Sequence, residues 1–206
     1  MYTVIMKRTV IGLVGPIASG KGEVAKYLRG LGFTILSLSD RVREEVDARG
    51  LPMSRENLQN VGNDLRETFG GHILAERTLE LFGNIEGNIV IDSIRNPSEI
   101  EFLKQTLDLT VIGIDASPEL RLERYLYRAA RRGEDRVSES DFIHSNSRDL
   151  GIGESVFGQQ VGRCLEMADV VIQNEDTKKH LLEAVDYYLI SELSFSPEGA
   201  RRAKEK

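Results

Sequence analysis

Five short runs of apolar residues recur along the chain, and longer segments with helical periodicity separate them. The runs are residues 9–14, 33–37, 88–92, 110–115 and 169–173. Each is almost continuously hydrophobic rather than alternating, which is typical of strands that are covered on both faces. The pattern therefore predicts an α/β protein with a five-stranded parallel sheet between layers of helices.

Local signals mark the starts of several of these helices. Asn96 and Ser117 each precede a proline, so each can cap a helix whose first residue is that proline. Thr177 can cap the last helix in the same way. A further helix is predicted directly after the first strand, because apolar residues recur there at helical spacing: Val24, Ala25, Leu28 and Leu31.

Two regions interrupt the simple alternation. Residues 40–82 contain no strand and are expected to form helices broken at Gly50-Leu51-Pro52 and Gly70-Gly71. Residues 131–158 are polar, contain glycine and are weakly periodic. Both follow strand–helix connections, where α/β proteins place their ligand sites. We expect one domain spanning residues 1–206, with insertions at about 40–84 and about 128–158.

Composition narrows the class of protein. The chain has 206 residues, of which 40% are hydrophobic and 29% charged, and its net charge is −6. This acidic balance argues against nucleic acid as a partner. No apolar stretch approaches the roughly 18 residues of a membrane span, and the single cysteine fits a reducing compartment. We expect a cytoplasmic protein with no membrane partner, and no feature of the sequence indicates an oligomeric state.

The segment GPIASGKGE, residues 15–23, carries the most specific motif. Its Gly15-x4-Gly20-Lys21 spacing follows a predicted strand and opens a predicted helix, as in loops that bind phosphate with backbone N–H groups. Lys21 can reach the terminal phosphates of a nucleotide. The alternative, a chance glycine-rich turn, fits this context poorly. The candidate nucleotide-binding residues are Gly15, Ala18, Ser19, Gly20, Lys21, Gly22 and Glu23.

The two residues after the lysine depart from the usual motif. Loops of this kind usually place a Ser or Thr there to hold Mg²⁺, whereas this chain has Gly22 and Glu23. Glu23 can hold a magnesium-bound water, or it can be a solvent-facing glutamate that the helix dipole favours. Both interpretations remain open at this stage.

Acidic residues stand just beyond three predicted strands, where they should meet around one crevice. Asp92 is the candidate to organise Mg²⁺ through water, with a turn or cap aspartate as the alternative. Asp40 can act as a general base or orient the acceptor, or it can simply cap the following helix. Asp115 is expected to be a strand-end or capping residue.

Arginines supply the complementary charge. Arg43 and Arg95 lie close after Asp40 and Asp92, and a guanidinium group suits the phosphate of an acceptor. A stripe of arginines then follows at helical spacing: Arg121, Arg124, Arg128 and Arg131, continued by Arg132, Arg136 and Arg148.

Three interpretations compete for this stripe. It can be a solvated face, a nucleic-acid patch, or a lid that closes over a transferring phosphoryl group. The phosphate loop favours a lid in which Arg124, Arg128 and Arg136 are catalytic. Arg121 is instead expected at the surface, and Arg148 is a candidate for binding the acceptor.

The order of the motifs GPIASGKGE, SLSDRVREE, VIDSIR, DASPELRLER and ADVVIQNEDT resembles the nucleoside monophosphate kinase branch of P-loop proteins. Within this branch, the chain is similar to an archaeal group related to adenylate kinase and dephospho-CoA kinase. The resemblance to that group includes the sequence GKGE at the end of the loop. It also resembles the kinase-like domain attached to some deoxycytidylate deaminases. The resemblance covers about residues 10–189. It implies a three-layer P-loop NTPase fold, an acceptor-binding helical insertion and a short arginine-bearing lid.

The resemblance also implies roles for single residues. Ser39-Asp40-x-x-Arg43 resembles the acceptor site of adenylate kinases, and Asp40 resembles the base-like aspartate of dephospho-CoA kinases. Asp92 and Arg95 resemble the magnesium-organising acid and the second acceptor arginine, spaced one residue closer than in adenylate kinases. Asn174 resembles the segment that contacts the adenine of the donor.

These observations predict a kinase that uses ATP and Mg²⁺ to phosphorylate a small nucleotide acceptor. A (deoxy)nucleoside monophosphate is the favoured acceptor, and dephospho-CoA is the alternative. A second class of function is a nucleotide-binding sensor that binds ATP without turnover, which the missing loop hydroxyl motivates.

Overall fold

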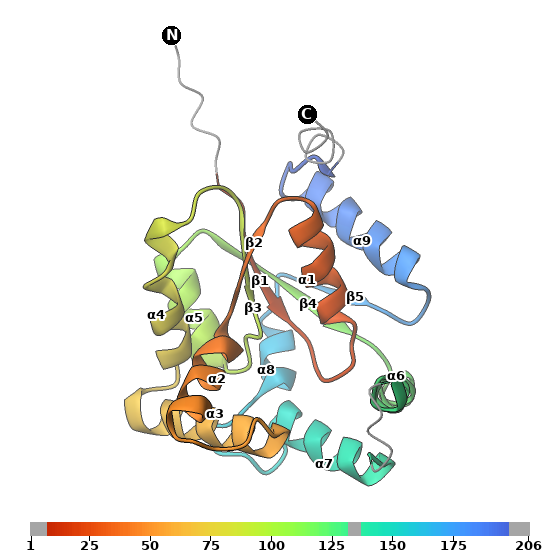
Figure 1. The fold of residues 1–206 in the computed structure, drawn as a ribbon. Coiled ribbons are helices and arrows are strands. Elements are labelled where there is room, and N and C mark those ends of the chain that lie inside the picture. The colour runs from red at the N-terminus through yellow and green to blue at the C-terminus, as the bar shows by residue number, and fades with distance from the viewer. Residues whose placement is uncertain (1–7, 132–136, 198–206) are drawn as a thin grey trace.

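The computed structural model describes residues 8–131 and 137–197. Its core is a five-stranded, wholly parallel sheet in the order β2-β3-β1-β4-β5 (Figure 1). The strands are β1 (Val10–Val14), β2 (Thr34–Ser37), β3 (Ile89–Asp92), β4 (Leu109–Asp115) and β5 (Val170–Gln173). The predicted fold class is confirmed, and each predicted strand is found within one residue of its expected bounds.

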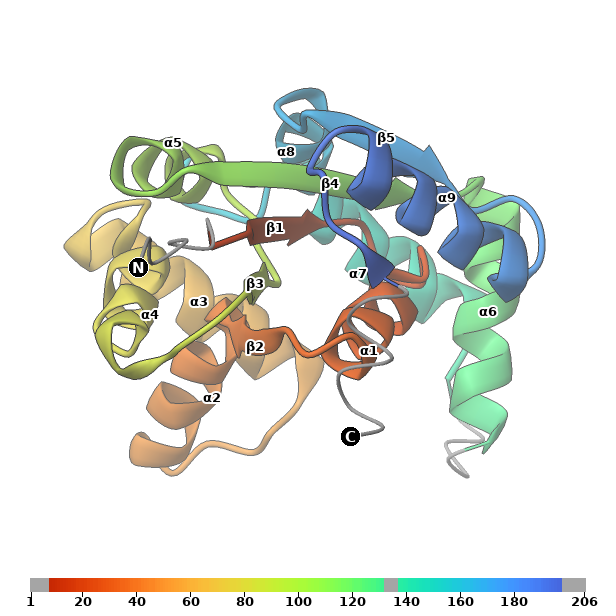
Figure 2. The ribbon, with the colours of Figure 1, turned by 90° about the horizontal axis from the view of Figure 1, so that it is seen from above.

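Helices cover both faces of the sheet. On one face lie α1 (Lys21–Gly30) and α9 (Lys178–Ser191). The opposite face is covered by α2 (Leu38–Ala48), α3 (Arg55–Phe69), α4 (Ile73–Leu79), α5 (Pro97–Thr106) and α8 (Val161–Glu166), with a short 3-10 turn at Phe82–Asn84. Figure 2 shows α1 and α9 on one side of the strands and α4 and α5 on the other.

The hydrophobic pattern explains this layering. All five residues of β1 are buried, and neighbouring residues of the strand pack into different cores. Ile11 and Leu13 contact the layer of α1 and α9, whereas Val10 and Val14 contact the opposite layer. A strand that buries both faces needs a continuous apolar run, which is the pattern in the sequence.

The predicted helix signals are also found. Asn96 accepts a hydrogen bond from the backbone of Ser98 and forms a capping box with Glu99. Thr177 caps α9 by accepting from the backbone N–H of His180. The segment after β2 forms α2, α3 and α4, and both breaks between these helices contain the predicted glycines.

Two further helices lie at the carboxyl ends of the strands, α6 (Pro118–Arg131) and α7 (Glu139–Leu150). Phe142 of α7 packs with Ile17 and Ala18 of the loop that follows β1. The weakly periodic region after α6 therefore contains a helix docked on this loop. Within residues 8–131 and 137–197, no helix is long and apolar enough to cross a membrane.

Candidate active site

The loop between β1 and α1 depends on glycine at both ends. A Cβ atom at Gly15 would lie 2.5 Å from the carbonyl oxygen of Ile114. At Gly20 the φ angle is 103°, and a Cβ would overlap with Nδ2 of Asn174. Ala18 adopts φ 63° without being glycine, a conformation that costs energy and is found mainly at functional sites.

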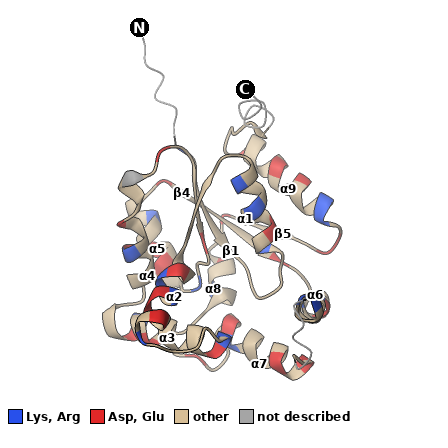
Figure 3. Ribbon diagram, viewed as in Figure 1, with Lys and Arg blue, Asp and Glu red and all other residues tan. Residues whose placement is uncertain are grey.

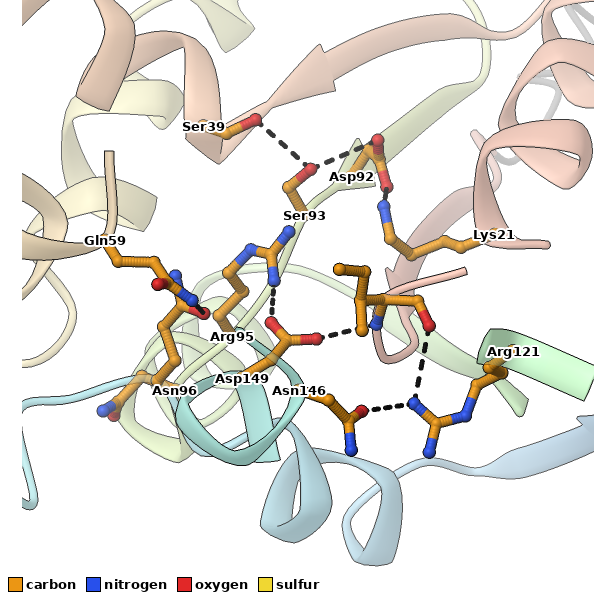
Figure 4. A network of polar contacts seen from close by, with 12 residues as sticks. Lys21, Ser39, Gln59, Asp92, Ser93, Arg95, Asn96, Arg121, Asn146 and Asp149 are labelled. Atoms are coloured by element: carbon orange, nitrogen blue, oxygen red, sulfur yellow. Dashed lines mark hydrogen bonds and ion pairs between the residues drawn. The ribbon is translucent and has the colours of Figure 1, made fainter. Parts of the chain in front are cut away.

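Side chains from distant segments hold this loop in place (Figure 4). The backbone N–H of Ile17 donates to Oδ2 of Asp149 over 2.8 Å, and the carbonyl of Ile17 accepts from Arg121 over 3.4 Å. Asn174 donates from Nδ2 to the carbonyl of Ser19 over 2.8 Å. Residues of α6, α7 and the end of β5 thus fix the loop conformation.

Arg121 corrects an expectation from the sequence, since it is not a surface residue. Its side chain is buried and donates to the carbonyl of Ala116 and to Oδ1 of Asn146. Burial lowers the pKa of the Arg121 guanidinium, and the nearby Asp115 and Asp149 oppose that shift. The arginine stripe therefore begins with a structural residue that joins α6 and α7 to the loop.

The loop opens into a cavity of about 530 Å³, called the donor cavity below. Its cationic lining residues are Lys21, Arg55, Arg95, Arg124, Arg128 and Lys178, and its acidic ones are Glu23 and Asp176. Of these, Arg124 and Arg128 lie on α6, whose basic residues are blue in Figure 3. In a protein with net charge −6, this local excess of positive charge favours a polyanionic ligand.

Two buried polar atoms of donor-cavity residues support such a ligand. The hydroxyl of Ser19 and Nη1 of Arg124 have no hydrogen-bond partner within the described part of the chain. Buried polar groups are normally paired, so each orphan needs a partner. Phosphate oxygens, which accept hydrogen bonds readily, would satisfy both. The residues present therefore fit the triphosphate of a nucleotide.

The predicted convergence of Lys21 and Asp92 is present. The ammonium group of Lys21 forms an ion pair with Oδ1 of Asp92 at the end of β3 (Figure 4). The other carboxylate oxygen accepts from Ser93 over 3.3 Å, and Ser93 accepts from Ser39 over 3.3 Å. Ser39 belongs to the motif that resembles an acceptor site, whereas sequence reasoning missed Ser93, which lies directly after the end of β3.

Oxygen donors near Asp92 suit a hard cation such as Mg²⁺, but they do not form a cage. Among residues 8–131 and 137–197, no group of three or more His, Cys, Asp or Glu residues could hold a metal ion. Mg²⁺ usually keeps several waters and binds through one or two carboxylates and the substrate phosphates. Asp92 with phosphate oxygens fits this second arrangement.

A second cavity of about 850 Å³, the acceptor cavity, lies next to the first. Arg55, Arg95 and Arg128 line both cavities, so the two spaces meet at three arginines. Arg43 and Arg148, predicted to bind the acceptor, line the acceptor cavity. Arg55 was missed by sequence reasoning, because an isolated arginine at the start of a helix carries no distinctive pattern.

Other predicted residues are placed less directly. Asp40 lies in the first turn of α2, pairs with Arg43 over 2.6 Å and lines neither the donor nor the acceptor cavity. Glu23 forms an exposed ion pair with Lys178 of α9. Asn174 lines the donor cavity, but its side chain is engaged with the loop. Arg136 lies outside the described residues.

A loop of Gly-x4-Gly-Lys between β1 and α1, in a parallel sheet of order 2-3-1-4-5, defines a P-loop protein with the fold of small-molecule kinases. The chain belongs to the UPF0200 family, and its residues 14–142 match the family model described as an AAA domain.

Two relatives illustrate the extent of this similarity. A UPF0200 protein of Pyrococcus horikoshii is 32% identical over 174 residues, covering 82% of this chain and 89% of the relative. Another from Methanoculleus marisnigri is 33% identical over 168 residues, covering 81% and 87%.

Solved structures share the fold. A protein of Thermus thermophilus superposes with a TM-score of 0.56 at 20% identity, covering 90% of this chain and 98% of its own. Shikimate kinase from Aquifex aeolicus gives a TM-score of 0.51 at 15% identity, covering 91% and 100%. At these identities the similarity concerns the fold alone.

Proposed function

We propose that the protein is a phosphotransferase that passes the γ-phosphoryl group of ATP, with Mg²⁺, to a (deoxy)nucleoside monophosphate. The observation that carries the proposal is the junction of the donor and acceptor cavities at Arg55, Arg95 and Arg128. Phosphoryl transfer depends on positioning and on cations around the group in transit, and this junction offers both.

On the donor side, the loop N–H groups, Lys21 and the Ser19 hydroxyl bind the phosphates. Lys21 must then exchange its present partner, Asp92, for phosphate oxygens. This exchange leaves the Asp92 carboxylate free to hold the waters of Mg²⁺, which neutralises charge on the phosphates when bound. Arg124 and Arg128 reach the donor cavity from α6 and stabilise the charge that develops during transfer.

On the acceptor side, the structure favours a phosphate as the nucleophile. The acidic residues that line the acceptor cavity are Glu56 and Asp141. Asp141 is engaged in the capping box of α7, where hydrogen bonds from Ser138 lower the pKa of its carboxyl group. A phosphate monoester has its second pKa near 6, so it is ionised at neutral pH and needs no base.

The same argument separates the two candidate acceptors. Dephospho-CoA would present a hydroxyl group, whose deprotonation needs a general base. The predicted base, Asp40, is exposed and paired with Arg43 outside both cavities. A hydroxyl acceptor would have to use Glu56 or His144, which also line the acceptor cavity, as its base. The arginines shared by the two cavities, and the position of Asp40 outside both, favour a nucleoside monophosphate.

The test is ADP formation from ATP and Mg²⁺ with a panel of ribo- and deoxynucleoside monophosphates and dephospho-CoA. We expect turnover with at least one monophosphate, its abolition by Lys21→Ala, and little effect of Lys26→Ala at an exposed lysine of the same helix. Turnover with dephospho-CoA alone would contradict the proposed acceptor. ATP binding without ADP formation from any acceptor would instead support a nucleotide sensor.

A further inference from the structure

Ser93, the residue directly after β3, has a backbone conformation that serine rarely adopts. Its φ angle is 65°, in the left-handed region, which costs free energy for residues other than glycine. The residue is 8% exposed and lines the acceptor cavity. Residues held in such conformations concentrate at active sites, where the surrounding structure enforces them. The strain at Ser93 therefore points to a function of its side chain.

The hydroxyl of Ser93 lies in the middle of a chain of hydrogen bonds. On one side it accepts from the hydroxyl of Ser39 over 3.3 Å, and Ser39 in turn accepts from Nη1 of Arg43 over 3.1 Å. On the other side it donates to Oδ2 of Asp92 over 3.3 Å, while Lys21 pairs with Oδ1 (Figure 4). The chain thus joins an arginine of the acceptor cavity to the lysine of the phosphate loop.

The chemistry of the two ends fixes the direction of this chain. The guanidinium group of Arg43 can only donate, and the ionised carboxylate of Asp92 can only accept. A further serine, Ser37, also donates to Ser93, over 3.2 Å. Because Ser93 accepts from Ser37 and Ser39, its single proton is directed at the carboxylate. Hydrogen bonds aligned in this way polarise one another, which strengthens the last bond of the chain.

This last bond matters most when a nucleotide is bound. In the proposed reaction Lys21 leaves Oδ1 of Asp92 for the phosphates, so Asp92 loses its ion pair and retains the bond from Ser93 to Oδ2. The 3.3 Å distance exceeds the roughly 2.7–2.8 Å typical of hydroxyl donors, and hydrogen bonds of unliganded sites often tighten in the complex. A carboxylate held through one oxygen presents its other oxygen in a fixed direction.

The phosphate loop offers no such support of its own. Gly22 and Glu23 stand where loops of this kind usually have a Ser or Thr that holds Mg²⁺. Glu23 is engaged in an exposed ion pair with Lys178. Support for the metal therefore depends on Asp92 and on the residue that orients its carboxylate.

We propose that Ser93 is a positioning residue, which orients Asp92 to hold the waters of Mg²⁺, and that its strained backbone is the consequence of placing the hydroxyl there. Ser93 acts through the carboxylate of Asp92 and is not itself a metal ligand. The inference rests on the proposed function in one respect, since Lys21 must exchange Asp92 for phosphate when a nucleotide binds.

The test measures the binding of AMP-PNP, a non-hydrolysable analogue of ATP, by isothermal titration calorimetry in saturating Mg²⁺ and in EDTA. The ratio of the two dissociation constants, called the Mg²⁺ ratio below, reports the contribution of the metal, because changes that affect both conditions cancel. We expect Mg²⁺ to tighten binding to the wild-type protein. Ser93→Ala should lower the Mg²⁺ ratio about fivefold, the size of one net hydrogen bond, with affinity in EDTA nearly unchanged.

Ser191→Ala, at the exposed end of α9, is the control and should alter neither quantity. An unchanged Mg²⁺ ratio in Ser93→Ala would overturn the inference. So would a wild-type protein that binds AMP-PNP equally well with and without Mg²⁺.

Ser93→Gly separates the hydroxyl from the backbone. It removes the hydroxyl as Ser93→Ala does, but glycine adopts φ 65° without strain. Both variants should lower the Mg²⁺ ratio equally, whereas Ser93→Gly should unfold at a higher urea concentration than Ser93→Ala. A Mg²⁺ ratio that Ser93→Gly retains, or equal urea midpoints for the two variants, would overturn the inference.

The outcomes separate this inference from the proposed function. A lowered Mg²⁺ ratio in both variants, without ADP formation by the wild-type protein from any acceptor, would support the positioning role and contradict the kinase. ADP formation by the wild-type protein with an unchanged Mg²⁺ ratio in the variants would support the kinase and overturn the positioning role. No binding of AMP-PNP by the wild-type protein would overturn both.

Discussion

The side-chain amide of Asn174 occupies the space that a methyl group on Gly20 would need. Gly20 also has φ 103°, whereas a Cβ on Gly22 would meet nothing within 4 Å. We expect Gly20→Ala to reduce the free energy of unfolding by about 1–3 kcal/mol and to weaken ATP binding. Gly22→Ala, its matched control in α1, should raise that free energy by about 0.5–1 kcal/mol. Urea unfolding measures both, and a shift of the same sign in the two variants would contradict this account.

Asp149 and Arg95 form a partly buried ion pair that also reaches the loop. Asp149 is fully buried, pairs with Arg95 through one oxygen and accepts from Ile17 through the other. Asp149→Ala should lower the free energy of unfolding by about 1–3 kcal/mol, because Ile17 loses its hydrogen-bond acceptor and Arg95, which is 24% exposed, loses its ion pair. Asp47→Ala, at an exposed helical position, should change it by less than about 0.5 kcal/mol. Similar midpoints for both variants in urea would argue against this role.

Arg128 and Arg131 lie about one turn apart on α6, but their side chains have different surroundings. Arg128 lines both cavities, whereas Arg131 lines neither and lies over the ring of Tyr127. We expect Arg128→Ala to reduce kcat for ADP formation by about 1000-fold, since arginines on a transferring phosphoryl group contribute this much. Arg131→Ala should retain most of the activity. Equal losses would mean that the stripe acts through general charge rather than through one contact.

Gly22 offers a direct test of the missing hydroxyl. Since a side chain fits there without a clash, Gly22→Ser should fold normally. If the usual hydroxyl contributes to Mg²⁺ binding, this variant should need less Mg²⁺ for half-maximal ADP formation than the wild type. An unchanged Mg²⁺ dependence would show that Asp92 and the phosphates suffice.

Cys164 should be chemically inert in the folded protein. It is fully buried, and burial raises the pKa of its thiol above the usual 9.0, with Glu99 adding to the shift. Iodoacetamide should therefore label the native protein at least about 100-fold more slowly than the unfolded chain.

The same shift makes stability depend on pH. Because the folded-state pKa is raised, the contribution of Cys164 is fully present below pH 9.0 and declines as the pH rises above it. Cys164→Ala should flatten this alkaline decline. If the free energy of unfolding falls with the same slope above pH 9.0 in the variant, the alkaline decline comes from other titratable groups.

Much of the fold could be predicted because its signals are local. Continuous apolar runs predicted strands buried on both faces, and Asn96 and Thr177 marked helix starts that the structure confirms. The phosphate loop was recognisable because its spacing and its position between a strand and a helix are specific. These features depend on neighbours in the chain, so a sequence displays them directly.

The parts that were missed depend on contacts between distant segments. The spacing of the arginines predicted that they share one face of a helix, but it did not predict which segments that face contacts. In the structure, α6 packs so that Arg121 donates to the carbonyl of Ile17 in the loop. Asp149 stands in a polar segment with no motif around it, yet it becomes fully buried. Asp40 had the right spacing for a site residue, but the first turn of α2 directs it toward Arg43 and solvent.

The bonds that hold the loop also set when it can form. The backbone N–H of Ile17 bonds to Asp149, which lies 132 positions later in the chain. The carbonyl of Ser19 bonds to Asn174, which lies 155 positions later. Such large sequence separations make folding slow, because the chain must close long loops before these contacts form. During synthesis the loop leaves the ribosome well before its partners, which follow 132 and 155 residues later. A nascent chain therefore fixes the conformation of its phosphate-binding loop only after Asn174 has been made.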